Sequence, residues 1–216
     1  MHSLCRTFLK PLFLLAIVIT GALVLSACGD GSDDDDTASI GQPTRKTFYI
    51  GGIPDQNVAI LETRFNKLAQ YLSEQTGLDV KYLPAVDYAA VVTGFKNNDL
   101  QMGWYGGLTG VQARIALPGS VAIVQRKSDE AFKSVFVARK GSGVTSLADI
   151  KGKNFVFGSE SSTSGHLMPR YYLKEANLTP EKDFSSVTYS GSHDKTWKLV
   201  ETGAGDVGAL NASVDA

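Results

Sequence analysis

The strongest chemical signal in the chain is a loop rich in hydroxyl groups at residues 158–165 (Gly-Ser-Glu-Ser-Ser-Thr-Ser-Gly). It follows the apolar run 155–157, which is typical of a strand, and it precedes a segment with helical character. Hydroxyls placed there would lie beside the unpaired N–H groups of the first helical turn, at the positive end of the helix dipole. One hydroxyl is enough to cap a helix. The longer run therefore favours anion binding over capping alone, and it nominates Ser162, Thr163 and Ser164.

A second polar loop, residues 190–194 (Ser-Gly-Ser-His-Asp), also follows a predicted strand and begins a predicted helix. His193 in this loop could donate an N–H to an oxyanion, or carry a positive charge when an anion is bound. A histidine that caps the helix or packs in the core is the alternative. Both interpretations stay open on the sequence alone.

Two tyrosines stand where they could reach the same ligand. Tyr88 falls in the first turn of a helix predicted after Asp87, and Tyr105 comes just past a predicted strand. Either phenol could hydrogen-bond an oxyanion, whereas packing against a neighbouring helix is the usual role of an isolated tyrosine. Trp104 is expected in the core or in the wall of a cleft.

The elements that must position these residues alternate along the chain. Leu61, Phe65, Leu68 and Leu72 are spaced by 4, 3 and 4 residues, which predicts an amphipathic helix that ends at Gly77. Further helices are expected near residues 87–95, 109–116, 164–176 and 193–202. Strands are expected at residues 48–50, 80–83, 100–105, 121–125, 134–138, 155–157, 186–189 and 206–210.

This alternation predicts an α/β fold with two lobes, residues 46–138 and residues 139–210, and a cleft between them. Residues 211–216 would then start a crossing back to the first lobe. Residues 134–138 are expected to cross between the lobes and to act as a hinge. Ligands of such sheets bind beyond the carboxyl ends of the strands, where the loops described above lie.

The front of the chain predicts an exported lipoprotein. Arg6 and Lys10 precede an apolar run that ends in Leu-Ser-Ala-Cys at residues 25–28, which resembles a bacterial lipobox. We expect a signal peptide at 1–27, a lipidated Cys28, and an acidic tether at 28–45 that holds the protein in the periplasm or at the outer face of the cytoplasmic membrane. An ordinary signal or membrane anchor with a chance cysteine is the alternative. The aspartates at 33–36 lack the spacing of a calcium loop.

Charge and cysteine content exclude several classes of function. Without residues 1–40 the chain keeps 19 basic side chains (21 minus 2) and 17 acidic ones (22 minus 5), so it has no strong field for nucleic acid. Lipidation of Cys28 leaves the mature protein without a free thiol. We expect no metal and no cofactor, and we expect the protein to be a monomer. No Gly-x-Ser-x-Gly elbow is present, so we expect no enzyme; His166 and His193 beside serines leave a Ser/His hydrolase as an alternative.

Four short segments of the chain occur in the same order and at the same spacing as in one protein family. They are residues 87–89 (Asp-Tyr-Ala), 104–106 (Trp-Tyr-Gly), 162–165 (Ser-Thr-Ser-Gly) and 191–193 (Gly-Ser-His). In them the chain resembles the phosphate, phosphite and phosphonate group of periplasmic binding proteins, the PhnD-like family, over about residues 48–211. The resemblance implies a type II periplasmic-binding-protein architecture and a role in an ABC importer, with a permease and an ATPase as partners. It implies a small tetrahedral oxyanion held by the residues Tyr88, Tyr105, Ser162, Thr163, Ser164 and His193. A sensor that presents its ligand to a membrane receptor kinase would use the same chemistry and is the alternative.

The sequence also departs from the family. Family members that bind aminoalkyl phosphonates carry an acidic residue where this chain has Ser213, and the matched positions hold no carboxylate. The amino-acid sequences of three segments resemble those of a branch of the family labelled as selenate-binding proteins. The segments are residues 53–57, 106–114 and 158–165. A site with donors only would suit a fully ionised anion such as selenate or sulfate. Family members continue past the last strand, so the resemblance implies a truncated return to the first lobe.

Overall fold

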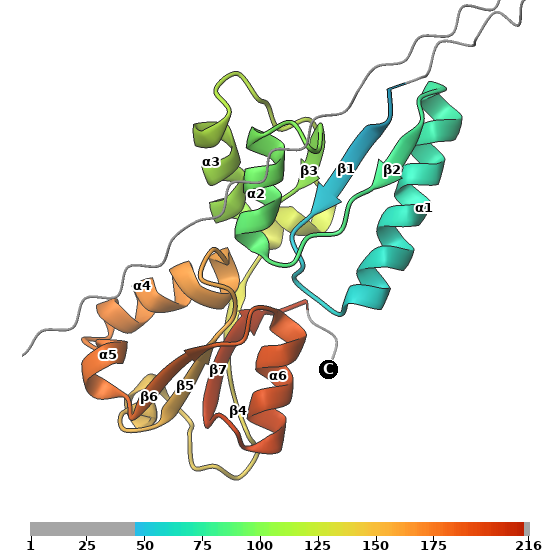
Figure 1. The fold of residues 1–216 in the computed structure, drawn as a ribbon. Coiled ribbons are helices and arrows are strands. Elements are labelled where there is room, and N and C mark those ends of the chain that lie inside the picture. The colour runs from blue at the N-terminus through green and yellow to red at the C-terminus, as the bar shows by residue number, and fades with distance from the viewer. Residues whose placement is uncertain (1–45, 214–216) are drawn as a thin grey trace, which may run out of the picture. The chain divides into compact units, whose positions relative to one another are not determined.

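A computed structural model describes residues 46–213 of the 216-residue chain. The predicted signal peptide at 1–27, the lipidated Cys28 and the acidic tether at 28–45 lie outside these residues, and their assignment stays a prediction. Within residues 46–213, no helix is both long enough and apolar enough to cross a membrane. The described residues form two β-sheets, each with its own helices (Figure 1).

The first sheet has three parallel strands in the order β2 (Val80–Tyr82), β1 (Phe48–Gly52), β3 (Met102–Trp104). Helix α1 (Val58–Thr76) lies along β1 and β2 (Figure 1). The Asn57 side chain accepts hydrogen bonds from the first amides of α1, and Gly77 ends the helix at φ 69°. The predicted apolar stripe packs against this sheet: the ring of Phe65 stacks on Tyr82 with 4.8 Å between centroids.

Two further helices complete the first lobe: α2 (Tyr88–Lys96) and α3 (Gly107–Ala116). The Asp87 carboxylate accepts a hydrogen bond from the Ala90 amide at 2.7 Å and caps α2, which begins after Asp87 as expected. Helix α3 begins two residues earlier than its sequence pattern predicts. Its N-cap is Gly106, which has no side chain with which to cap the helix.

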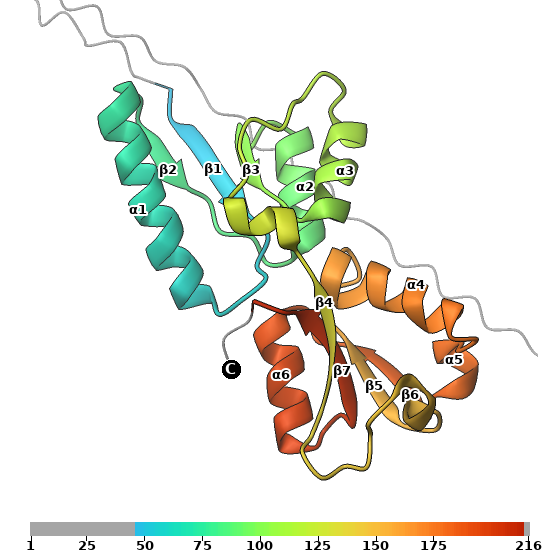
Figure 2. The same ribbon diagram turned by 180° about the vertical axis from the view of Figure 1, so that it is seen from behind.

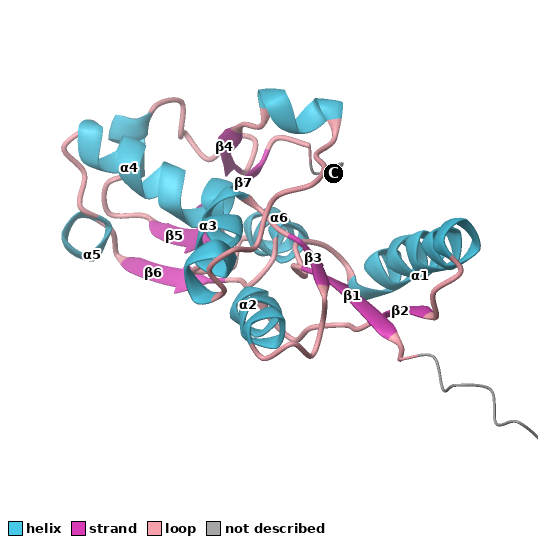
Figure 3. Cartoon of the chain, turned by 90° about the horizontal axis from the view of Figure 1, so that it is seen from above, coloured by secondary structure: helices cyan, strands magenta, loops and turns pink. Residues whose placement is uncertain are grey.

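The second sheet has four strands in the order β4 (Ser134–Ala138), β7 (Val207–Asn211), β5 (Asn154–Phe157), β6 (Ser186–Tyr189). β4 is antiparallel to β7, and the other pairs are parallel (Figure 2). Along the chain, two α-helices lie between β5 and β6 and one lies between β6 and β7. Figure 3 shows the helices and strands in separate colours. These α-helices are α4 (Met168–Glu175), α5 (Pro180–Asp183) and α6 (His193–Thr202).

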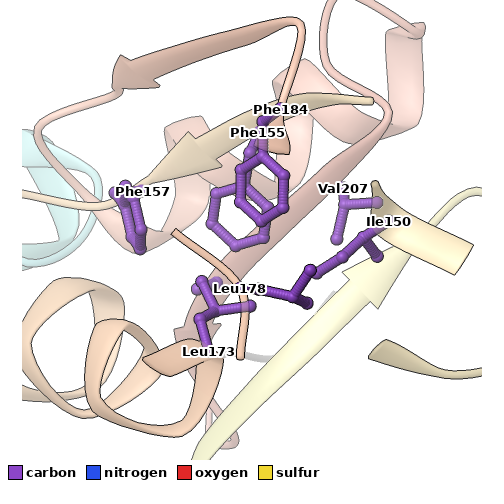
Figure 4. Packing of buried hydrophobic residues seen from close by; sticks show 8 residues of the cluster. Ile150, Phe155, Phe157, Leu173, Leu178, Phe184 and Val207 are labelled. Carbon is purple, nitrogen blue, oxygen red and sulfur yellow. The ribbon is translucent and has the colours of Figure 1, made fainter. Parts of the chain in front are cut away.

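The core of the second lobe is aromatic (Figure 4). Phe155 and Phe157 of β5 are fully buried, and Phe184 stacks on Phe155 with 5.1 Å between centroids. Leu173 of α4 and Ile150 of a short 3₁₀ turn (Leu147–Ile150) pack into the same cluster. This packing fixes β5, and therefore the loop that follows it.

Two expectations about strands are wrong. Residues 121–125 form no strand, and the side chains of Val121, Ile123 and Val124 are 76%, 70% and 68% exposed. Their composition is typical of a strand, but no strand among residues 46–213 pairs with them. Without a neighbouring strand, their main-chain N–H and C=O groups have no partners with which to form a sheet. Residues 134–138 belong wholly to the second sheet, where all five pair with β7. The boundary between the sheets therefore precedes Ser134 and does not follow Ala138.

The hydroxyl-rich loop enters its helix through a π-helical turn, η3 (Thr163–Leu167), which runs directly into α4. The Leu167 amide donates to the Ser162 carbonyl at 3.0 Å, a bond that spans five residues. In an α-helix the amide one residue earlier would make that bond.

Candidate anion-binding site

Four helices begin at the edge of one cavity. Tyr88 is the first residue of α2, Gly107 of α3, Thr163 of η3 and His193 of α6, and all four line the cavity. The first N–H groups of a helix have no acceptor within it, and its dipole places partial positive charge at that end. The cavity edge therefore has a positive potential before any charged side chain is considered.

The cavity has a volume of about 1190 Å³, far more than a small oxyanion fills. Most of its lining is apolar and runs along the first sheet. Polar residues such as Gln101, Arg114 and Arg126 also line it. One group of polar residues lies where segments of the two lobes touch, and we call this part the polar end of the cavity. It comprises one carboxylate that the sequence analysis did not nominate and all six predicted site residues: Asp55, Tyr88, Tyr105, Ser162, Thr163, Ser164 and His193.

Two of the predicted hydroxyls at the polar end already accept hydrogen bonds. Ser162 Oγ accepts from the Gly165 amide at 3.0 Å, and Thr163 Oγ1 accepts from the Leu108 amide of α3 at 2.7 Å. A hydroxyl that accepts a bond keeps its own hydrogen for donation. Both groups are therefore held in place as donors, and the bond that Thr163 accepts from Leu108 also links the two lobes.

Two further hydroxyl groups at the polar end have no hydrogen-bond partner within residues 46–213. Ser164 is 1% exposed and Tyr88 is 2% exposed, yet neither Ser164 Oγ nor Tyr88 Oη has a hydrogen-bond partner among the described residues. A buried polar group without a partner costs about 1–3 kcal/mol, so folded proteins rarely leave one unpaired. A bound ligand would supply the missing acceptor for both.

Tyr88 can donate a hydrogen bond throughout the physiological pH range. Burial raises the pKa of its phenol above the ordinary value, and the Asp55 carboxylate raises it further. The Ser162 hydroxyl acts in the opposite direction, although it lies outside hydrogen-bonding geometry. The phenol therefore stays protonated and keeps its hydrogen for a ligand.

His193 is a neutral donor. Its ring is 3% exposed, and Nδ1 accepts from the buried Asn211 amide at 3.4 Å. Because Nδ1 acts as an acceptor, the ring proton lies on Nε2, for which residues 46–213 offer no acceptor. Burial lowers the pKa of His193 to about 4, against a small opposing effect of Asp194, so the ring is uncharged at neutral pH.

Tyr105 fits the packing alternative better than it fits a ligand contact. Its hydroxyl donates to the Val91 carbonyl at 3.4 Å, and its ring meets Phe95 edge-on with 6.0 Å between centroids. Burial raises the pKa of this phenol to about 12. The side chain lines the cavity, but unlike Tyr88 it has an acceptor within the protein.

Asp55 is the residue that the sequence analysis missed. The expectation of a site without a carboxylate is wrong, because Asp55 lines the polar end. Its main-chain carbonyl accepts from the His193 amide at 3.0 Å, a second link between the lobes. Asp55 follows the carboxyl end of β1, so the rule that nominated the other loops also applies to it.

His166 supports the loop and takes no part in the cavity lining. Arg170 Nε donates to His166 Nε2 at 2.9 Å, so the ring proton lies on Nδ1, which donates to the Glu160 carbonyl at 2.7 Å. Arg170 is held in turn by Glu181 at 2.7 Å. With both nitrogens engaged, His166 cannot serve as the base that the hydrolase alternative requires.

Comparison with known proteins identifies the family. The model of the periplasmic substrate-binding proteins of phosphonate ABC transporters matches residues 50–214. The chain belongs to this family. Its members are substrate-binding proteins rather than enzymes, which removes the remaining support for a Ser/His hydrolase.

Relatives within the family agree with the fold. A probable ABC transporter phosphite-binding protein, PhnD1 of Prochlorococcus marinus (strain MIT 9301), is 49% identical over 177 residues, which are 78% of this chain and 59% of PhnD1. The structure of PhnD1 in complex with methylphosphonate matches with a TM-score of 0.76 and 47% identity, over 79% of this chain and 65% of that one.

A crystal structure from Pseudomonas aeruginosa, the binding-protein component of an ABC phosphonate transporter, matches with a TM-score of 0.67 and 26% identity, over 78% of this chain and 58% of that one. These matches confirm the predicted periplasmic-binding-protein architecture. The chain spans less than two thirds of the length of each of these relatives.

Proposed function

We propose that this protein is the substrate-binding component of an ABC importer and that it captures a small tetrahedral oxyanion of the phosphonate and phosphite type. The observation that carries the proposal is the pair of buried hydroxyls without partners, Ser164 Oγ and Tyr88 Oη, which line one cavity from different lobes. The family supports the same role. A phosphite-binding name and a methylphosphonate complex among its relatives support this class of ligand.

The expected mechanism is capture by closure of the two lobes. The second lobe offers the hydroxyls of residues 162–164 and the Nε2–H group of His193, and the first lobe brings the Tyr88 phenol over the anion. Hydrogen bonds to a charged group contribute roughly 1.5–3 kcal/mol each, so four or five of them support micromolar or tighter binding after the ordering costs. The bonds Leu108–Thr163 and His193–Asp55 would close the lobes around the ligand.

Calorimetric titration tests the ligand class directly. We expect the purified protein to bind methylphosphonate, phosphite or phosphate with micromolar or tighter affinity. Ser213 stands where aminophosphonate binders carry an acid, so 2-aminoethylphosphonate is expected to bind more weakly than methylphosphonate. Failure to bind any anion of a panel that also includes sulfate and selenate would refute the proposed function.

We further propose that Cys28 carries the lipid that holds the protein outside the cytoplasmic membrane. The Leu-Ser-Ala-Cys segment before a polar, acidic tether supports this proposal. Mass spectrometry of the membrane-bound protein and of a Cys28→Ser variant tests it, since the variant should lose both the acyl mass and the membrane association. Stimulation of a co-purified transporter ATPase by the liganded protein would separate an importer component from a sensor.

A further inference from the structure

The Asp55 carboxylate poses a problem for a site that binds anions. A second acidic side chain lines the cavity, Asp129, and it is neutralised by Arg126 at 2.7 Å. No side chain among residues 46–213 donates to the Asp55 carboxylate in the same way. An unpaired negative charge beside a bound anion would weaken binding unless the ligand itself supplies a hydrogen.

The position of Asp55 is fixed by its main chain. Its amide donates to the Ile53 carbonyl at 2.9 Å, and its carbonyl accepts from the His193 amide at 3.0 Å. The main chain of Asp55 is therefore hydrogen-bonded to His193, the first residue of α6 and one of the proposed ligand donors. Its charge also acts on the Tyr88 phenol, another hydrogen-bond donor of the polar end.

The remaining charges around Asp55 do not neutralise it by direct contact. Arg126 and Arg64 favour its ionised form from a distance, and Asp194 opposes it. Burial raises the pKa of the carboxyl group and outweighs both a hydrogen bond from the Asp55 main chain and the attraction of the two arginines. A hydrogen-bond donor on the ligand would relieve this desolvation.

Oxyanions differ in whether they can offer such a donor. Monoprotonated phosphonate, phosphite and phosphate each carry one P–OH group, and phosphate monoesters lose their last proton only near a pKa of about 6. Sulfate and selenate at neutral pH have acceptors only. A carboxylate placed among several N–H and O–H donors can therefore separate the two groups of anions by hydrogen bonding rather than by size.

We propose that Asp55 is a specificity-determining residue: its carboxylate accepts a hydrogen bond from the P–OH group of a monoprotonated phosphonate, phosphite or phosphate, and it excludes sulfate and selenate. This inference rests on the proposed function and narrows it to oxyanions that carry a proton. It opposes the preference for selenate or sulfate that the sequence suggested, because that preference assumed a site without a carboxylate.

The test compares two variants that remove the same charge at different places. Asp55→Asn keeps the side-chain shape and the main-chain bonds but replaces an acceptor oxygen by an N–H donor. Asp194→Asn is the matched control: its carboxylate already accepts from the Ser192 hydroxyl at 2.6 Å and does not line the cavity. Each protein is titrated calorimetrically at neutral pH with methylphosphonate, phosphite, sulfate and selenate.

We expect Asp55→Asn to lower the ratio of methylphosphonate affinity to sulfate affinity by tenfold or more, through weaker binding of the first anion and tighter binding of the second. Asp194→Asn should change all four affinities by a similar factor and leave the ratio as it is. A uniform change in Asp55→Asn would overturn the inference and leave the proposed function intact.

The wild-type protein gives a further test that needs no variant. Tighter binding of sulfate or selenate than of methylphosphonate would also overturn the role of Asp55, whether or not Asp55→Asn folds. Absence of binding to every anion would instead count against the proposed function itself. The two failures are therefore distinguishable.

Discussion

Replacing Ser164 by alanine should change stability and affinity in opposite directions. Ser164 is 1% exposed, and its hydroxyl has no partner among the described residues. In the unliganded protein the substitution removes a buried group that has lost its water without gaining a hydrogen bond. That penalty is about 1–3 kcal/mol, and the small void left by the oxygen offsets part of it. We expect a net gain of about 1 kcal/mol.

For a protein of this size, about 1 kcal/mol corresponds to a rise in melting temperature of roughly 2–4 °C. Binding should respond with the opposite sign, since the anion loses a bond worth about 1.5–3 kcal/mol. The dissociation constant should then rise by about tenfold to a hundredfold. Thermal melts with and without methylphosphonate, together with calorimetric titration, measure both quantities on the same sample.

Ser162→Ala is the natural control, because it makes the same chemical change two residues away. Ser162 Oγ accepts from the Gly165 amide, so its loss should lower the stability of the unliganded protein by about 1 kcal/mol as well as the affinity. If Ser164→Ala lowered the melting temperature of the unliganded protein and left the affinity unchanged, the assignment of its hydroxyl to a ligand would be wrong.

Three other predictions follow from the same site. His193 has a pKa of about 4 in the folded protein and of about 6.5 in the unfolded chain. The unfolded chain therefore binds the proton first, and the free energy of unfolding should fall by up to about 3 kcal/mol as the pH drops from about 6.5 to about 4. Urea titrations measure this loss, which should be largely absent in His193→Gln. Thr163→Val removes the acceptor for the Leu108 amide, so stopped-flow measurement should show ligand dissociation about tenfold faster, and an unchanged rate would argue against a closing contact. In Gly165→Ala the new Cβ would lie 3.1 Å from Gly158 Cα, so denaturant unfolding should show a loss of about 1–3 kcal/mol, and undiminished stability would mean that the loop can shift.

The sequence nominates residues that the structure places at one cavity, because their signals are local. Ser162 and Thr163 stand at a junction of strand and helix that short-range patterns identify, and His193 stands at another. The π-helical turn was not predicted, since its hydrogen-bond shift leaves no distinct pattern of apolar residues. Which hydroxyls are unpaired was not predictable either, because that depends on contacts such as the one between Thr163 and Leu108, 55 positions apart.

The errors arise where pairing between distant segments decides the structure. Residues 121–125 have the composition of a strand, but a strand also needs a neighbour, and its composition does not show whether one is present. β4 was assigned to the wrong lobe for a related reason, since its partner β7 lies about seventy residues further along the chain. Asp55 has the position of a site residue but not the expected charge. It follows a strand as the nominated loops do, but a carboxylate repels an anion, so a criterion based on attraction for anions does not select it.

The π-helical turn changes the number of main-chain N–H groups that have no acceptor at the start of the helix. An α-helix leaves its first four amides without a carbonyl of their own, whereas the wider turn at η3 leaves one more, that of His166, because Leu167 takes the Ser162 carbonyl instead. The extra amide adds to the partial positive charge at the start of the helix without adding a formal charge or a flexible side chain. A substitution of any side chain in this turn would leave that contribution in place as long as the backbone keeps its wider winding.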